Sequence, residues 1–107
     1  MDVTAKYSKA LPRDWRGLAE VFTALGDEHR QRILLMFERG DELTIKDVVD
    51  QVPLSRTAVT HHLRVLRESG VLEAQKRGKE VYLRPNAARV LEAIEALRSY
   101  IKDEFRL

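Results

Sequence analysis

The chain has 107 residues, of which 44% are hydrophobic and 34% charged, and it carries a formal net charge of +2 and no cysteine. This size and composition are typical of one soluble globular domain, and the lack of cysteine excludes disulfide bonds, thiolate metal sites and thiol redox sensing. No apolar run approaches the ~20 residues of a membrane-spanning helix and no secretory signal pattern is present, so we expect a cytoplasmic protein.

The basic residues concentrate in one part of the chain. Residues 55–84 carry seven basic and three acidic side chains, whereas the remaining residues together carry a net charge of −2. A local excess of +4 within a nearly neutral domain is typical of a surface that binds a polyanion. A solvated basic face accounts for the charge alone equally well.

The first predicted helix follows a segment without regular structure. Residues 1–13 lack a sustained hydrophobic period, so we expect them to be mobile, with a single domain over residues 14–107. From Asp14 onward, apolar residues recur at helical spacing and stop at Gly26, a residue type favoured at helix C-termini. The pattern therefore predicts a helix that begins at Asp14 and ends before Gly26.

Two further helices are predicted from capping residues and apolar spacing. Asp27 is placed to cap a second helix that runs to Gly40. Thr44 and Asp47 resemble a capping box at the start of a short third helix, which Pro53 prevents from continuing. The apolar residues of these helices that we expect in the core are Ile33, Leu34, Met36, Phe37, Ile45, Val48 and Val49.

A fourth helix and a β-hairpin follow. Ser55 is a good N-cap for a helix over residues 55–69, and Gly70 supplies a left-handed exit. The strand-like runs VLEAQ and EVYLR flank KRGK, whose glycine permits the tight reversal of a hairpin, and Pro85 ends the second strand.

The last predicted helix is amphipathic, and Asn86 can cap it. Its apolar stripe consists of Val90, Leu91, Ile94, Leu97, Ile101 and Phe105. The stripe either packs back on the chain's own core or pairs with a copy of itself. Because the preceding domain is small, we favour the second arrangement, alongside the first helix.

The fourth helix contains two adjacent histidines in the run AVTHHLRVL, residues 58–66. At about 100° per residue, His62 lies in the middle of the apolar arc and His61 on the polar arc. We interpret His62 as a buried histidine with a hydrogen-bond partner rather than as a ligand or catalyst. Because His61 has no second histidine at ligand spacing, the pair is not a metal or catalytic site.

The polar arc of this helix presents a row of hydrogen-bonding side chains along one side of a rigid helix. Arginine can bridge a guanine edge, threonine can contact a base or a thymine methyl group, and histidine can donate to purine or phosphate acceptors. Such a helix fits the major groove of DNA, and with the short helix before it forms a helix-turn-helix whose N-terminal N–H groups favour a phosphate. The candidate DNA contacts here are Ser55, Arg56, Thr57, Thr60, His61 and Arg64.

The hairpin tip carries three cations, Lys76, Arg77 and Lys79, around Gly78. Like charges this close repel one another unless an anion lies nearby, so we predict that the tip contacts the backbone or minor groove of DNA. A solvated charged turn is the alternative.

These segments resemble the ArsR/SmtB family of small bacterial transcriptional repressors. LAEVFTALGDEHRQRIL is similar to the family's entry signature, LTIKDVVDQVPLSRTAVTHHLRVLRESGVL to its helix-turn-helix and EAQKRGKEVYLR to its wing, and the middle segment contains the specific pattern SxxxVxxHLxxLxxxG. The resemblance implies a mainly α fold with a small β-hairpin, the winged helix-turn-helix, and a homodimer formed by the first and last helices. It also implies that Arg56, Thr57, Thr60 and His61 face operator DNA.

The sensing sites typical of the family are missing from this sequence. Family members that bind arsenic, cadmium or lead use cysteines of the third helix, redox sensors need two cysteines, and zinc, nickel and cobalt sensors use Asp and His on the last helix. This chain has no cysteine, and residues 86–107 contain no histidine. We therefore expect no metal site or cofactor, and the carboxylates of the last helix fit a solvated face better than hard-metal ligands: Glu92, Glu95, Asp103 and Glu104.

The sequence thus predicts a DNA-binding transcriptional regulator, a repressor that binds an inverted-repeat operator as a homodimer through the helix at 55–69 and the wing at 76–79. The alternative is a ligand- or metal-responsive sensor with an atypical site that lacks cysteine, whose inducer is unknown. An enzyme would need a nucleophile, a phosphate-binding loop or a paired acid–base motif, and none accompanies the histidines. A pure protein-interaction module would bind no duplex even at low salt.

Overall fold

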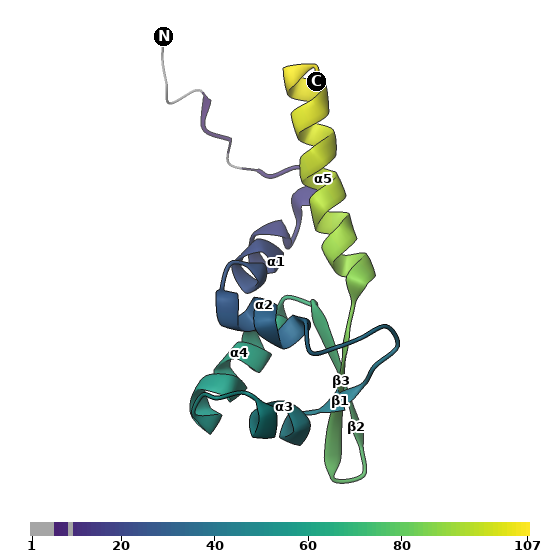
Figure 1. Cartoon of the computed structure of the whole chain (residues 1–107). Coiled ribbons are helices and arrows are strands. Elements are labelled where there is room, and N and C mark those ends of the chain that lie inside the picture. Colours follow the sequence, from purple (N-terminus) through teal and green to yellow (C-terminus); the bar gives the residue numbers. More distant parts are fainter. Residues whose placement is uncertain (1–5, 9) are drawn as a thin grey trace.

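The structure, a computed structural model, describes residues 6–8 and 10–107. In chain order these residues form the 3-10 helix η2 (Arg13–Trp15), helices α1 (Leu18–Leu25) and α2 (Glu28–Leu34), strand β1 (Leu43–Thr44), helices α3 (Ile45–Gln51) and α4 (Arg56–Glu68), strands β2 (Leu72–Arg77) and β3 (Glu80–Pro85), and helix α5 (Ala87–Phe105) (Figure 1). The predicted winged helix-turn-helix is confirmed. The expectation that residues 1–13 are mobile falls partly outside the described residues. None of the described helices is long and apolar enough to cross a membrane.

The first helix begins later than predicted. Instead of a helix from Asp14, the chain forms the single turn η2, becomes extended at Arg16 (ψ 123°) and passes through the left-handed region at Gly17 (φ 76°) before α1 begins. A Cβ atom at Gly17 would overlap the guanidinium of Arg89 in α5. That guanidinium is the end of a flexible side chain that can move aside, so the positive φ is what favours glycine here, and hydrophobic spacing does not reveal it.

Helix α2 begins where predicted and ends early. Asp27 caps it, because its carboxylate accepts hydrogen bonds from two backbone N–H groups of the first turn, at 2.8 and 3.1 Å. The helix ends at Leu34, so the predicted extension to Gly40 is wrong. Met36 and Phe37 still pack partly buried against the core, but from a turn. The prediction that these two apolar side chains contribute to the core was correct, but the prediction that they belong to a helix was wrong.

The other predicted caps are confirmed. Thr44 and Asp47 form a reciprocal capping box at the start of α3. Ser55 and Asn86 each accept a hydrogen bond from the backbone N–H three residues further on, at 3.1 and 3.2 Å. Gly70 adopts the left-handed conformation after α4 (φ 82°). Each cap satisfies N–H groups that have no partner inside their own helix.

The hairpin belongs to a three-stranded antiparallel sheet with the strand order β1-β3-β2. Leu43 of β1 lies opposite Leu83, and Thr44 lies opposite Tyr82. No sequence pattern predicts β1, since a two-residue strand is too short to show alternation and forms only through its pairing with β3. The third strand attaches the wing to the chain that leads into α3.

The core lies where helices α1 to α4 meet the base of the sheet. Its fully buried side chains are Val21, Ala24, Ile33, Val48, Val59, Leu63, Leu66, Val71, Leu72 and Leu83. Packing of these residues fixes α4 against the other helices, and it leaves the opposite side of α4 open to solvent.

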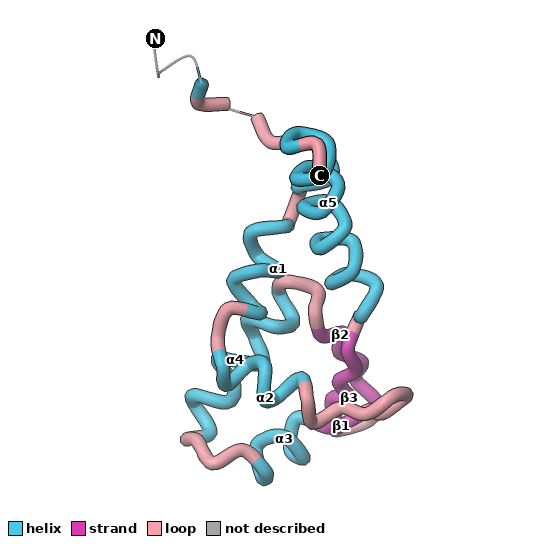
Figure 2. Tube along the Cα trace, turned by 45° about the horizontal axis from the view of Figure 1, so that its top comes forward, coloured by secondary structure: helices cyan, strands magenta, loops and turns pink. Residues whose placement is uncertain are grey.

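Helix α5 starts beside this core and then extends away from it (Figures 1 and 2). Ala93 and Ala96 are buried, and the Trp15 ring of η2 packs edge-on against Tyr100 with 5.2 Å between the ring centroids. Much of the predicted apolar stripe is exposed: Leu91 63%, Ile94 45%, Ile101 37% and Phe105 65%. Val90 at the start of the stripe packs against the core, but most of the stripe does not pack back on it.

Candidate nucleic-acid interface

Helix α4 has the two faces that its sequence predicts. The side chains of its apolar arc are buried or partly buried: Ala58, Val59, His62, Leu63, Val65 and Leu66. Those of its polar arc are exposed: Arg56, Thr57, Thr60, His61, Arg64, Arg67 and Glu68. The helix is thus held from behind by apolar packing and presents a continuous polar face to solvent.

His62 is a largely buried structural residue, as expected. Its side chain is 13% exposed, and Nδ1 lies 3.2 Å from Nη1 of Arg30. Because a guanidinium can only donate, Nδ1 accepts this hydrogen bond and the neutral ring carries its proton on Nε2. Burial lowers the pKa of His62 below the ordinary 6.5, while the Asp27 carboxylate at 4.0 Å acts in the opposite direction.

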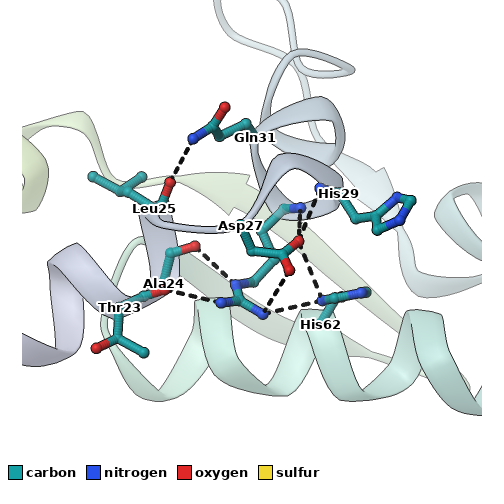
Figure 3. A network of polar contacts seen from close by, with 8 residues as sticks. Thr23, Ala24, Leu25, Asp27, His29, Gln31 and His62 are labelled. Carbon is teal, nitrogen blue, oxygen red and sulfur yellow. Dashed lines mark hydrogen bonds and ion pairs between the residues drawn. The ribbon is translucent and has the colours of Figure 1, made fainter.

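The same Arg30 connects three helices. Figure 3 shows this network of polar contacts, with Thr23, Ala24 and His62 labelled. Its Nε donates to the carbonyl of Ala24 at 2.8 Å and its Nη2 to that of Thr23 at 2.9 Å, both at the C-terminal end of α1. From α2 it also reaches His62 of α4. The role of Arg30 is not predictable from the sequence, because a lone arginine on a short helix gives no indication of which carbonyl groups it will meet. The orientation of α4 thus depends on polar contacts as well as on apolar packing.

The six candidate contacts at the start of α4 and along its polar arc lie where the sequence analysis places them. The Ser55 hydroxyl is used as the N-cap. The side chains of the other five form no hydrogen bond or ion pair with a residue that the structure describes: Arg56, Thr57, Thr60, His61 and Arg64. They are available to a partner outside the chain.

The three cations of the hairpin tip differ in their surroundings. Lys76 and Lys79 are exposed and form no ion pair within the described part of the chain. Arg77 instead makes a two-point contact with Glu42, with Nη1 at 2.6 Å from Oε2 and Nη2 at 3.0 Å from Oε1. The hydrogen bond from Arg77 lowers the pKa of Glu42 below its usual value. Glu42, in the loop before β1, carried no signal in the sequence.

An open groove of about 940 Å³ separates the C-terminal part of α4 from β2 and β3. Arg64 and Arg67 line it from the helix, and Arg77 and Arg84 line it from the strands. The two strand arginines are paired with carboxylates at 2.6 and 3.0 Å. Arg67 and Arg84 were not among the predicted contacts, because the groove exists only where the helix packs beside the sheet.

The carboxylates of α5 lie among cations. Glu92 is 3.8 Å from Arg89 and Glu95 is 3.4 Å from Arg98, and all four belong to the solvent side of the helix or its edge. Asp103 and Glu104 are exposed. Among the described residues no three His, Cys, Asp or Glu side chains are placed to hold one metal ion.

Comparisons with known proteins agree on the class of domain. Residues 25–75, from the end of α1 into β2, match the HTH_20 helix-turn-helix domain family. The chain is 33% identical over 78 residues to the cadmium resistance transcriptional regulatory protein CadC homolog of Staphylococcus aureus, covering 73% of this chain and 64% of that one. It is 27% identical over 81 residues to the transcriptional repressor SdpR of Bacillus subtilis, covering 76% and 89%. The chain therefore spans somewhat less than two thirds of the staphylococcal protein and most of SdpR.

A solved structure extends the likeness to the whole fold. An ArsR-like transcriptional regulator from Rhodococcus sp. RHA1 is 30% identical, superposes with a TM-score of 0.75, and is matched over 86% of each chain. The superposition thus covers much more of the chain than residues 25–75.

Proposed function

The chain belongs to the ArsR/SmtB family of winged helix-turn-helix transcriptional regulators, which bind double-stranded DNA and are not enzymes, and we propose that it represses transcription as a homodimer bound to an operator. The main support for this proposal is the exposed polar face of α4. The polar face of α4 carries five side chains without internal partners among the described residues, on a helix whose other face is buried in the core.

In this proposal α4 lies in the major groove and the wing lies along the backbone. The base-reading side chains are Arg56, Thr57, Thr60, His61 and Arg64, with the N-terminal end of α4 at Ser55 next to a phosphate. The wing at residues 76–79 adds phosphate contacts. Figure 1 supports this arrangement, since α4 and the hairpin tip lie at the end of the molecule opposite the C-terminal end of α5.

The dimer would form through α5, flanked by α1. The exposed apolar side chains of α5 support this, because single exposed apolar residues are common on monomers but a stripe along one helix marks an interaction surface. The domain over residues 14–107 would then contain both its DNA-binding and its dimerisation helices. A twofold axis would present two α4 helices to successive major grooves, so the operator should be an inverted repeat with half-site centres about 34–36 Å apart.

Selection of bound duplexes from a random-sequence library tests this proposal. Anisotropy titrations of the selected duplex at several salt concentrations should show the logarithm of affinity falling linearly with the logarithm of salt concentration. Failure to bind any duplex at low salt would contradict the proposal. Screening the bound complex for release by metals and metabolites tests the alternative, a sensor with an atypical inducer site.

A further inference from the structure

Contacts on one face of the sheet hold Arg77 away from the tip of the wing. Besides its two contacts with Glu42 at 2.6 and 3.0 Å, Nη2 donates to Oε1 of Gln75 at 2.8 Å. The guanidinium carbon lies 4.6 Å from the centroid of the Tyr82 ring. Although the Arg77 side chain is 44% exposed, a planar guanidinium that is bound at two points and stacked on a ring has less conformational freedom than the lysines beside it, which have no such contacts.

The partner carboxylate connects the wing with the helix-turn-helix. Glu42 immediately precedes β1, where Thr44 pairs with Tyr82 of β3 and also caps α3. Arg77 ends β2, on the far side of β3 from β1. Its side chain therefore crosses the ring of Tyr82 and spans all three strands to reach Glu42.

We propose that Arg77 is a positioning residue, which by pairing with Glu42 sets the angle between the wing and the helix-turn-helix, while Lys76 and Lys79 supply the wing's phosphate contacts. This inference rests on the proposed function, because it concerns the same DNA complex. Glu42 balances the charge of Arg77 at short range, whereas the two lysines have no carboxylate partner among the described residues. Glu42 and Gln75 together engage three of the five N–H donors of Arg77, so a phosphate would have only the second Nη1–H and Nε–H to bind.

Two conservative variants separate positioning from direct contact. Arg77→Lys keeps the charge and loses the planar two-point geometry, and Glu42→Gln keeps the size and loses the charge. If Arg77 positions the wing, each variant weakens operator binding about two- to fivefold with an unchanged salt slope. The double variant should then have an operator affinity no lower than that of the single variant with the lower affinity, because both substitutions remove the same Arg77–Glu42 contact. Amide hydrogen exchange in β2 and β3 of the free protein should also become faster in each variant.

Two control variants complete the test. Glu73→Gln removes another carboxylate of the sheet, the partner of Arg84, and should not weaken binding, while Lys79→Gln should lower the salt slope by about one. The proposal is overturned if Arg77→Lys binds like the wild type, or if Glu42→Gln binds more tightly than it. If the wild type binds no duplex, the proposed function fails instead, and hydrogen exchange in the free variants still decides whether the pair holds the wing.

Discussion

The guanidinium of Arg30 donates from Nη1 to Nδ1 of His62 across 3.2 Å, and this bond joins α2 to α4 behind the polar face of α4. Removing the acceptor leaves a largely buried cation with one partner fewer. We therefore expect His62→Ala to lower the free energy of unfolding by about 1–3 kcal/mol, measured by urea denaturation at pH 8. His61→Ala, on the exposed face of the same helix, is the matched control and should change it by less than about 0.5 kcal/mol. Equal losses from both variants would contradict this role.

The same contact predicts a pH dependence of stability. Since burial holds the pKa of folded His62 below the 6.5 of the unfolded chain, the unfolded state takes up this proton first as the pH falls. The contribution of neutral His62 is fully present above about pH 6.5, and it declines as the pH falls through 6.5 toward the lower folded pKa. Unfolding free energies of the wild type and His62→Asn, measured between pH 8 and pH 5, should therefore converge at the acid end. Parallel curves would show that His62 does not titrate differently on folding.

The exposed stripe of α5 predicts the effect of a charge at the dimer contact. Leu91→Glu introduces a carboxylate where the proposed interface buries a side chain that is 63% exposed in the single chain. We expect this variant to sediment as a monomer at micromolar concentrations where the wild type sediments as a dimer. Leu35→Glu is the control, since Leu35 is 82% exposed but follows α2, outside α5. A Leu91→Glu protein that remains dimeric would exclude α5 as the interface.

Substitutions in α4 and in the wing should weaken DNA binding in different ways. Arg56→Ala is expected to reduce discrimination at one base pair of the operator by about 1–3 kcal/mol. Lys79→Ala should weaken all sequences alike and lower the salt slope by about one. Lys102→Ala, near the C-terminal end of α5, is the control and should change neither quantity. The division of roles fails if Arg56→Ala and Lys79→Ala reduce base discrimination equally.

Local signals predicted the elements of the fold well. The caps at Asp27, Thr44, Ser55 and Asn86 each use a backbone N–H no more than three residues away, so sequence spacing alone reveals them. The two faces of α4 were also correct, because one helix packed on one core produces a regular period. The break at Gly17 was missed because the hydrophobic period does not reveal the positive φ of a single residue.

The sequence by itself determined the caps, the polar face of α4 and the tight turn of the wing, because these depend on atoms a few residues apart or on a simple period. The tertiary structure decided which long side chains meet: Arg30 with His62 across 32 residues, and Arg77 with Glu42 across 35. It also decided that β1 exists and that the stripe of α5 stays exposed. A flexible charged side chain can reach many partners in the unfolded chain, and only the packing of distant segments selects one of them.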